Sequence, residues 1–327
     1  MFGLRLKMTI LLIIFFGIIY AVISVIGYAL GIQNFLFYLF LALFFVFLQY
    51  LIGPKIVEIV MNVRYVNERE EPWLHEVVEE LSRKANIPKP KVGIAEINVP
   101  NAFAFGRSLR DGRVCVTRGI LRILNKNELK AVLGHEISHL KHRDVIFITL
   151  LSVLPLLLYL IARNLFFMGM YSRRSERERG NLPLVLVGLF AFIMYFITNL
   201  LVLYASRIRE YFADTGSVKL GSRPSHLASA LYKLVYGNAR INKEELKQYE
   251  GIKAFFLNDP SRALKEIRDL REIDLDLSGE IEEDELLALR NKKVKLSFED
   301  KLFEILSTHP NMLKRIKYLS ELERGGF

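Results

Sequence analysis

Cysteine is nearly absent from this chain of 327 residues, and charge is absent from several long stretches of it. The single cysteine, Cys115, excludes a framework of intrachain disulfides, which fits a reducing compartment. The chain has no stripe of Lys and Arg interleaved with aromatic residues, so its net charge of +10 does not indicate a nucleic-acid partner. Basic residues instead flank apolar blocks, which is typical of a membrane protein.

The first uncharged block covers residues 8–54. It is too long for one crossing, since ~20 residues span the hydrocarbon core. Gly31–Asn34 breaks the block, so we expect two helices, Met8–Leu30 and Phe35–Ile52, joined by a tight turn. A signal peptide is the alternative for the first helix. The apolar stretch exceeds the ~7–15 residues of a signal-peptide core and no cleavage site follows, which favours an uncleaved anchor.

With the two helices of residues 8–54 counted as the first and second uncharged blocks, the third and fourth blocks are Val145–Ala162 and Leu182–Ser206, which contain 18 and 25 residues. Both are long enough to predict a second membrane hairpin, and a pair of buried core helices remains the alternative. The blocks divide the chain into an anchor hairpin (1–54), the first part of a polar domain (55–144), the second hairpin (145–206) and the second part of the polar domain (207–327).

Positive charge beside the blocks predicts that both termini and the polar domain face the cytoplasm. The flanking residues are Arg5, Lys7, Lys55, Lys141, Arg143, Arg207 and Arg209. The loop Arg163–Asn181 opposes this orientation, because it carries five arginines and two glutamates and four simple spans would place it outside. The second hairpin is therefore expected to cross incompletely or to pack against the polar domain.

The polar domain is expected to be mainly α-helical with a small β-sheet. Helical periodicity covers Trp73–Ala85, and Lys91–Ile97 and Val114–Thr117 are strand candidates. Arg110–Arg113 reads as a turn between them, and Pro224–Tyr236 as a later helix.

One predicted helix carries the candidate chemistry. His135 to His139 read His-Glu-x-x-His, and Asn125 followed by Glu128 has the spacing of a capping box at the start of a helix. On a helix His135 and His139 share a face. Two imidazoles so placed can hold one zinc ion, and Glu136 between them can act on a zinc-bound water. The alternative is an amphipathic helix with surface histidines.

A third metal ligand follows the fourth block. Glu210 and Asp214 are four residues apart, on one face of a helix. Glu210 can complete a two-His, one-Glu site with an open position, and Asp214 can orient a ligating imidazole. His142 and Asp144 are rival ligands that rank lower, because they follow His139 too closely to surround the same ion easily. A charged helix leaving the membrane is the alternative.

Taken in order, these elements resemble the HtpX-type membrane zinc endopeptidases, relatives of the CAAX prenyl endopeptidases. The matching pieces cover most of the chain: Asn101-Ala102-Phe103-Ala104, His135–His139, Glu210–Asp214, and Thr308-His309-Pro310 with Arg315. The resemblance implies a cytoplasmic zincin-like (gluzincin) domain with Glu210 as third ligand and Asp214 beside it. It implies that His309 lies at the bound substrate as a second catalytic residue and that Arg315 braces the site. Asn101, Ala102, Phe103 and Ala104 would form an edge strand that receives a peptide. The region from about 241 to 303 fits the family least well.

The resemblance implies a multi-pass enzyme of the cell membrane that cleaves misfolded or membrane proteins with one zinc ion. Its partners would be protein or peptide substrates and the lipid bilayer, with no nucleic acid. A prenyl-protein endopeptidase and a catalytically inert zinc scaffold are the alternatives. A transporter is disfavoured, because the four blocks carry no charged residue.

An acidic stretch owes nothing to this family. Residues 274–285 fit an EF-hand calcium loop, with Asp274, Asp276 and Ser278 at positions 1, 3 and 5, glycine at 6 and Glu285 at 12. Glu280, at position 7, is a further candidate ligand. An inserted calcium-binding segment over about 258–297 is therefore expected. The alternative is an acidic turn in which Leu275 and Leu277 pack on the core.

Overall fold

The computed structural model describes residues 35–144, 182–241, 273–292 and 297–323, together with 147, 155, 158, 159, 161–163, 165, 266, 267 and 270. The chain divides into two compact units, Met1–Ile52 with Phe147–Ala205, and Gly53–Ile146 with Ser206–Phe327. The expected helix Met8–Leu30, most of the third block and nearly all of the loop Arg163–Asn181 lie outside the described residues. The two membrane hairpins therefore stay predictions.

Two long helices run from the first unit into the second. Helix α2, Phe35–Val60, begins at the expected residue but continues past Ile52 and through Pro54. Proline removes only one hydrogen bond of the ladder, and Val57 and Met61 are buried in a cluster with side chains of the sheet, which stabilises the final turns. Helix α7, Leu182–Lys219, continues past the end of the fourth block without interruption. Among the described helices, only α7 has the length and composition to cross a membrane.

The second unit contains a four-stranded sheet. Its strands are β1 (Val63–Tyr65), β2 (Lys91–Ala95), β3 (Ala102–Phe105) and β4 (Arg113–Thr117), in the order β1-β2-β4-β3. Only β2 and β4 are parallel. Strand β2 ends two residues before the expected Ile97, and the 3-10 turn η1 (Leu109–Asp111) stands where the turn was expected. Strand β3 lies at one edge of the sheet, as the resemblance implied for this segment.

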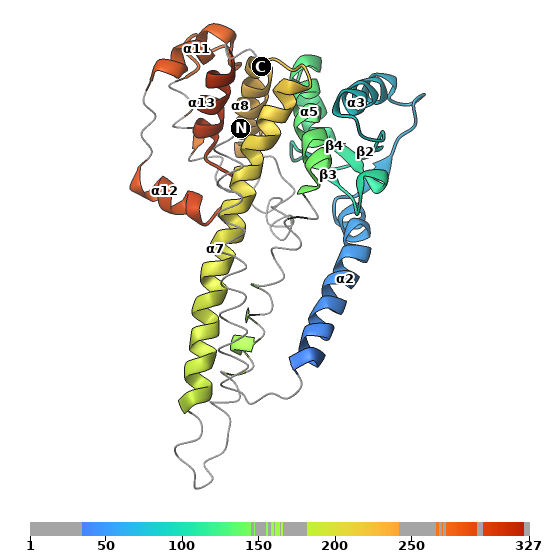
Figure 1. Ribbon diagram of the computed structural model, residues 1–327. Helices are drawn as coiled ribbons and strands as arrows, with labels where there is room; N and C mark the ends of the chain where they lie inside the picture. The colour runs from blue at the N-terminus through green and yellow to red at the C-terminus, as the bar shows by residue number, and fades with distance from the viewer. Residues whose placement is uncertain are drawn as a thin grey trace. The chain divides into compact units, whose positions relative to one another are not determined.

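Helices α3 (Pro72–Ala85), α4 (Arg118–Ile123) and α5 (Lys126–His142) pack on this sheet (Figure 1). The unit also contains α8 (Pro224–Ala239), α11 (Glu283–Asn291), α12 (Phe298–Ile305) and α13 (Met312–Leu322). Helix α5 is central and packs on β3, β4, α3 and α8, while α13 packs on α8 and α11. The main core lies among these elements, and a second cluster on the other face of the sheet includes Phe103, Phe105 and Cys115.

The first turn of α5 confirms the predicted capping box. The Asn125 side chain accepts from the Glu128 N–H at 3.0 Å, and the Glu128 carboxylate accepts from the Asn125 N–H at 2.9 Å. Both hydrogen bonds satisfy backbone N–H groups that the start of a helix otherwise leaves without partners. The cap therefore fixes where α5 starts and which of its faces turns inward.

Helices α5 and α7 approach very closely beyond the apolar block of α7. A Cβ on Gly216 would lie 2.0 Å from Ser138 Oγ, and one on Gly134 would lie 2.9 Å from Ser217 Oγ. The Ser217 hydroxyl donates to the Ala131 carbonyl oxygen at 2.6 Å. The glycines thus permit a helix crossing that places the histidine face of α5 against the acidic face of α7.

Candidate metal centre

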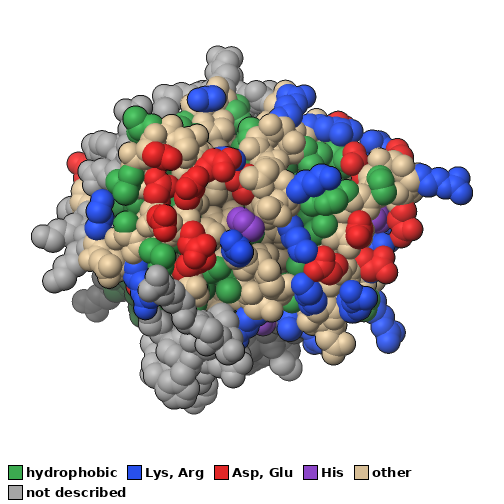
Figure 2. All heavy atoms as spheres, turned by 90° about the horizontal axis from the view of Figure 1, so that it is seen from above, with side chains coloured by type: hydrophobic (Ala, Val, Ile, Leu, Met, Phe, Trp, Pro, Cys, Tyr) green, Lys and Arg blue, Asp and Glu red, His purple; other side chains and the backbone are tan. Residues whose placement is uncertain are grey.

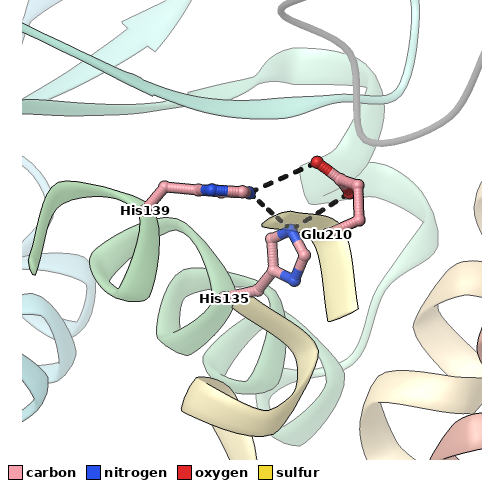
Figure 3. A group of neighbouring side chains, drawn as sticks. All are labelled: His135, His139 and Glu210. Atoms are coloured by element: carbon pink, nitrogen blue, oxygen red, sulfur yellow. Dashed lines mark hydrogen bonds and ion pairs between the residues drawn. The ribbon is translucent and has the colours of Figure 1, made fainter. Parts of the chain in front are cut away.

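Three side chains from two helices converge at this crossing (Figure 3). His135 Nε2 and His139 Nε2 lie 3.0 Å apart. Glu210 Oε2 lies 3.6 Å from His135 Nε2, and Glu210 Oε1 lies 3.5 Å from His139 Nε2. Their potential ligand atoms all fall within 4.8 Å of one another. The structure therefore brings together the two imidazoles and the carboxylate that the sequence predicts as ligands.

The second nitrogen of each imidazole faces a carboxylate. His135 Nδ1 lies 2.9 Å from Asp214 Oδ1, and His139 Nδ1 lies 2.6 Å from Asp144 Oδ2. Such carboxylates hold the imidazole proton on Nδ1 and fix the ring orientation. Asp144 thus contacts the back of His139, whereas the sequence offered it only as a rival ligand. Arg209 forms an ion pair with Asp144 and belongs to the same arrangement.

Arg315 connects the two acidic residues of α7. Its guanidinium donates to Asp214 Oδ2 at 3.0 Å and to Asp214 Oδ1 at 2.6 Å, and its Nη1 lies 3.0 Å from Glu210 Oε2. The Arg315 side chain is fully buried. Burial alone would lower the pKa of Arg315, but the charges of Asp214 and Glu210 raise it. Its permanent positive charge offsets two buried carboxylates.

The donor set fits a zinc ion. With both Nδ1 atoms close to carboxylates, the two Nε2 atoms lie 3.0 Å apart, an arrangement that a cation between them would relieve. Two imidazole nitrogens and one carboxylate oxygen are a ligand set that zinc enzymes use. Among the described residues, no fourth His, Cys, Asp or Glu joins the group.

Glu136 lies beside the ligands without belonging to their group. Its carboxylate is 4% exposed, and burial raises its pKa, while the neighbouring imidazoles and the Ala104 N–H lower it. The Ala104 N–H donates to Glu136 and therefore points away from β4. Backbone N–H groups alternate in direction along an antiparallel strand, so the Ala102 N–H also points away from β4. The edge of β3 that faces away from β4 therefore runs beside Glu136.

The remaining candidates take different positions. His142 Nδ1 contacts the Ser138 carbonyl oxygen of its own helix at 2.8 Å and lies outside the ligand group. Asn101 is fully buried and its N–H donates to Thr117 Oγ1 at 2.9 Å, so it anchors the start of β3. His309 is buried, with Nε2 3.9 Å from Glu210 Oε1.

A second group of possible ligands lies apart from these residues, in the acidic stretch. Oxygens of Asp274, Asp276 and Glu285 fall within 4.8 Å of one another. Ser278 and Glu280, the other two candidates, are not in this group of carboxylates. Leu275 and Leu277 are 62% and 80% exposed, so the alternative in which they pack on the core is wrong.

Comparison with known proteins gives one family. Residues 68–323 match the model of peptidase family M48. A protease HtpX homolog of Methanothermobacter thermautotrophicus is 56% identical over 232 residues, which are 71% of this chain and 86% of the relative. The homolog of Aquifex aeolicus is 34% identical over 316 residues, covering 95% and 90% of the two chains. The crystal structure of Ste24p from S. mikatae aligns with a TM-score of 0.46 and 20% identity over 81% of this chain and 66% of that one, a likeness too weak to carry an argument. The match over most of the chain, together with the ligand group on α5 and α7, shows that this protein belongs to peptidase family M48 and is similar to the HtpX proteases.

Proposed function

We propose that this protease is a zinc-dependent endopeptidase of the cell membrane that cleaves misfolded or membrane proteins on the cytoplasmic side. One observation carries the proposal: two imidazole nitrogens and a carboxylate converge on one point beside a buried glutamate. A structural zinc scaffold would close the fourth position and would give Glu136 no task. The family and the buried Glu136 beside the ligand group both support catalysis.

The chain supplies every proton transfer of peptide hydrolysis. A zinc ion held by His135, His139 and Glu210 would activate water and polarise the peptide carbonyl. Glu136 takes the proton of the attacking water at its carboxylate and delivers it to the nitrogen of the leaving amine, as general base and then general acid. His309, beside Glu210, is proposed to contact the substrate, and Arg315 holds Glu210 in place.

The edge of β3 is the proposed site for the substrate backbone. An extended peptide that pairs with Ala102 and Ala104 would be held mainly by main-chain hydrogen bonds, which tolerates varied sequences. The Ala104 N–H, now bonded to Glu136, would be one of the donors. Residues 102–105 are at most 7% exposed, so substrate binding requires an adjoining segment to move.

A short helix supports a position at the membrane surface. Four apolar side chains at the end of α12 are about half exposed: Leu302, Phe303, Ile305 and Leu306. Arg207, the first charged residue after the fourth block, donates through Nη1 to the Ile305 and Ser307 carbonyl oxygens at 2.9 and 2.7 Å. An exposed apolar helix face at the end of an apolar segment suits the lipid interface.

Metal removal and restoration tests the proposed activity. The detergent-solubilised protein should contain one zinc ion per chain and cleave casein. A chelator should abolish cleavage, and added zinc should restore it. Cleavage that continues in metal-free protein would contradict the zinc mechanism. In parallel, faster cleavage of a prenylated peptide than of an unfolded membrane protein would favour the prenyl-protein alternative.

Cysteine labelling tests the proposed topology. Cys115 is fully buried, and burial raises the pKa of its thiol; replacing it with serine leaves a clean background. A cysteine at Ser175 reports on the charged loop, and one at Lys130 on α5. An impermeant reagent should leave the Lys130 cysteine unlabelled in intact cells. Labelling there from outside would reverse the orientation, while labelling at Ser175 decides only whether the second hairpin crosses.

A further inference from the structure

A second metal site is carried by the acidic loop, defined here as residues 274–285, which ends in the first turn of α11. We propose that this loop binds one calcium ion through Asp274, Asp276, Ser278, Glu285 and the carbonyl oxygen of Glu280. The loop is separate from the zinc ligands and takes no part in the proposed hydrolysis.

Asp274 gives the strongest indication of a cation site. The residue is 4% exposed, and its Oδ1 is buried without a hydrogen-bond partner. Its carboxylate lies in the group formed with Asp276 and Glu285, and among the described residues none of the three makes an ion pair within 4.0 Å. A buried carboxylate oxygen without a partner is costly, and two nearby carboxylates increase that cost. A divalent cation would relieve both.

The rest of the loop is already arranged around the same point. Asp274 Oδ2 accepts from the Tyr232 hydroxyl at 2.6 Å and from the Gly279 N–H at 3.1 Å, which leaves Oδ1 to bind an ion. Gly279 has a φ of +83°, which a residue with a side chain rarely adopts. This is the glycine that the sharp turn of a calcium loop requires at position 6.

Two uncharged oxygens complete the set. Ser278 Oγ lies 3.4 Å from the Glu280 carbonyl oxygen. The Glu280 side chain instead pairs with Lys233 at 2.5 Å, so Glu280 contributes its main-chain oxygen, as position 7 of such loops does. Glu285 accepts from the Leu275 and Glu282 amides, and each carboxylate oxygen keeps a lone pair for a metal.

The ligand chemistry selects calcium. All the converging atoms are oxygens, which hard cations prefer, and the flexible turn suits the six to eight ligands of calcium better than the strict octahedron of magnesium. Acidic side chains gather on the surface over α11 (Figure 2), although the chain as a whole has a net charge of +10. The exposed acids of the loop are Asp276, Glu280, Glu282, Glu283 and Asp284.

Binding would tie two helices of the protease unit together. Tyr232 connects Asp274 to α8, and Glu285 lies in the first turn of α11. Helices α8 and α11 both pack on α13, which carries Arg315. Calcium is therefore expected to raise thermal stability by fixing α11 against α8 and α13.

The test uses the full-length protein with zinc bound and with Glu136→Gln to prevent self-cleavage. Titration calorimetry with calcium chloride should show one saturable site per chain, with a dissociation constant of ~10⁻⁴–10⁻³ M, the weak end of the range for such loops. The same calcium should raise the unfolding temperature. Magnesium at equal concentration should give a smaller heat and a smaller shift.

Asp276→Asn and Asp284→Asn form the matched pair. Both residues are exposed and each variant removes one negative charge from the loop, but only Asp276 is among the converging ligands. Asp276→Asn should weaken calcium binding at least tenfold, while its unfolding temperature without calcium should equal or exceed that of the parent, because one of the clustered charges is removed. Asp284→Asn should bind as the parent does. No saturable heat up to ~10 mM calcium, well above this range, or equal weakening by both substitutions, would overturn the proposal.

Discussion

The metal centre and the acidic loop each bring three potential ligands within 4.8 Å, but their surroundings differ. In the metal centre the ligands stand on two long helices locked together by glycines, and each has a buried partner of its own. In the acidic loop the ligands stand on one turn, with Asp276 exposed. Rigid helices hold the few ligands of a tetrahedral zinc site, whereas a turn can adapt to a larger ion with more ligands. The comparison teaches that the scaffold, as well as the ligand type, selects the ion.

The largest change should come from removing a zinc ligand. Glu210→Ala leaves two imidazoles and deprives Arg315 of one carboxylate, so zinc and proteolysis should both be lost. Zinc content and casein cleavage measure this, and calcium titration should be unchanged. Normal zinc affinity in Glu210→Ala would show that another residue is the third ligand.

Gly216→Ala should disrupt the crossing of α5 and α7. The metal centre depends on this crossing, whereas the acidic loop does not. The new Cβ would lie 2.0 Å from Ser138 Oγ, and overpacking of this kind costs about 1–3 kcal/mol. We expect a lower unfolding temperature and weaker zinc binding. The control is Gly53→Ala, also in a helix, where nothing beyond its two chain neighbours lies within 4 Å of the new Cβ, so no loss of zinc binding is expected. Equal stability of the two variants would contradict the close crossing.

Asp144→Asn should weaken zinc binding without removing a ligand. Asp144 lies 2.6 Å from His139 Nδ1, and losing such a partner typically costs 10–100-fold in metal affinity. Competition with a zinc-binding dye measures the change. His142→Gln is the control, because the His142 ring lies outside the ligand group, against Ser138 and near Phe212, so its loss should leave the zinc affinity unchanged. Weaker zinc binding in His142→Gln, with unchanged binding in Asp144→Asn, would indicate that His142 is a ligand.

Tyr232→Phe should give the smallest effect, and only at the acidic loop. The variant loses the 2.6 Å hydrogen bond to Asp274, worth about 1 kcal/mol net. Thermal unfolding should show this loss and calcium binding should weaken, while zinc content stays constant. A loss of zinc in Tyr232→Phe would mean that the two regions are not separate.

The sequence predicted the helix of His135 and its capping box because both follow from local spacing. It predicted the helix carrying Glu210 for the same reason. It could not predict the crossing of α5 with α7, since a sequence does not reveal that Gly216 faces Ser138. The close approach became visible only when the two helices were placed together.

The partner of His139 was missed for a related reason. Asp144 follows α5 after Arg143, whose φ of +55° turns the chain back so that the carboxylate reaches His139 Nδ1. Spacing alone suggested a competing ligand. Helix α2 extends past the expected Ile52, because packing of Val57 and Met61 stabilises further turns beyond the uncharged block. In both cases a tertiary contact, which the local sequence pattern does not reveal, determined the structure.

Glu136→Gln tests the central claim most directly, since it separates zinc binding from catalysis in one preparation. Glutamine keeps the size of Glu136 but cannot take up a proton, and losing a general base typically costs ~10²–10⁴-fold in rate. We predict one zinc ion per chain, as in the parent, with casein cleavage reduced by that factor. Cleavage at the parental rate by the zinc-loaded variant would contradict the mechanism.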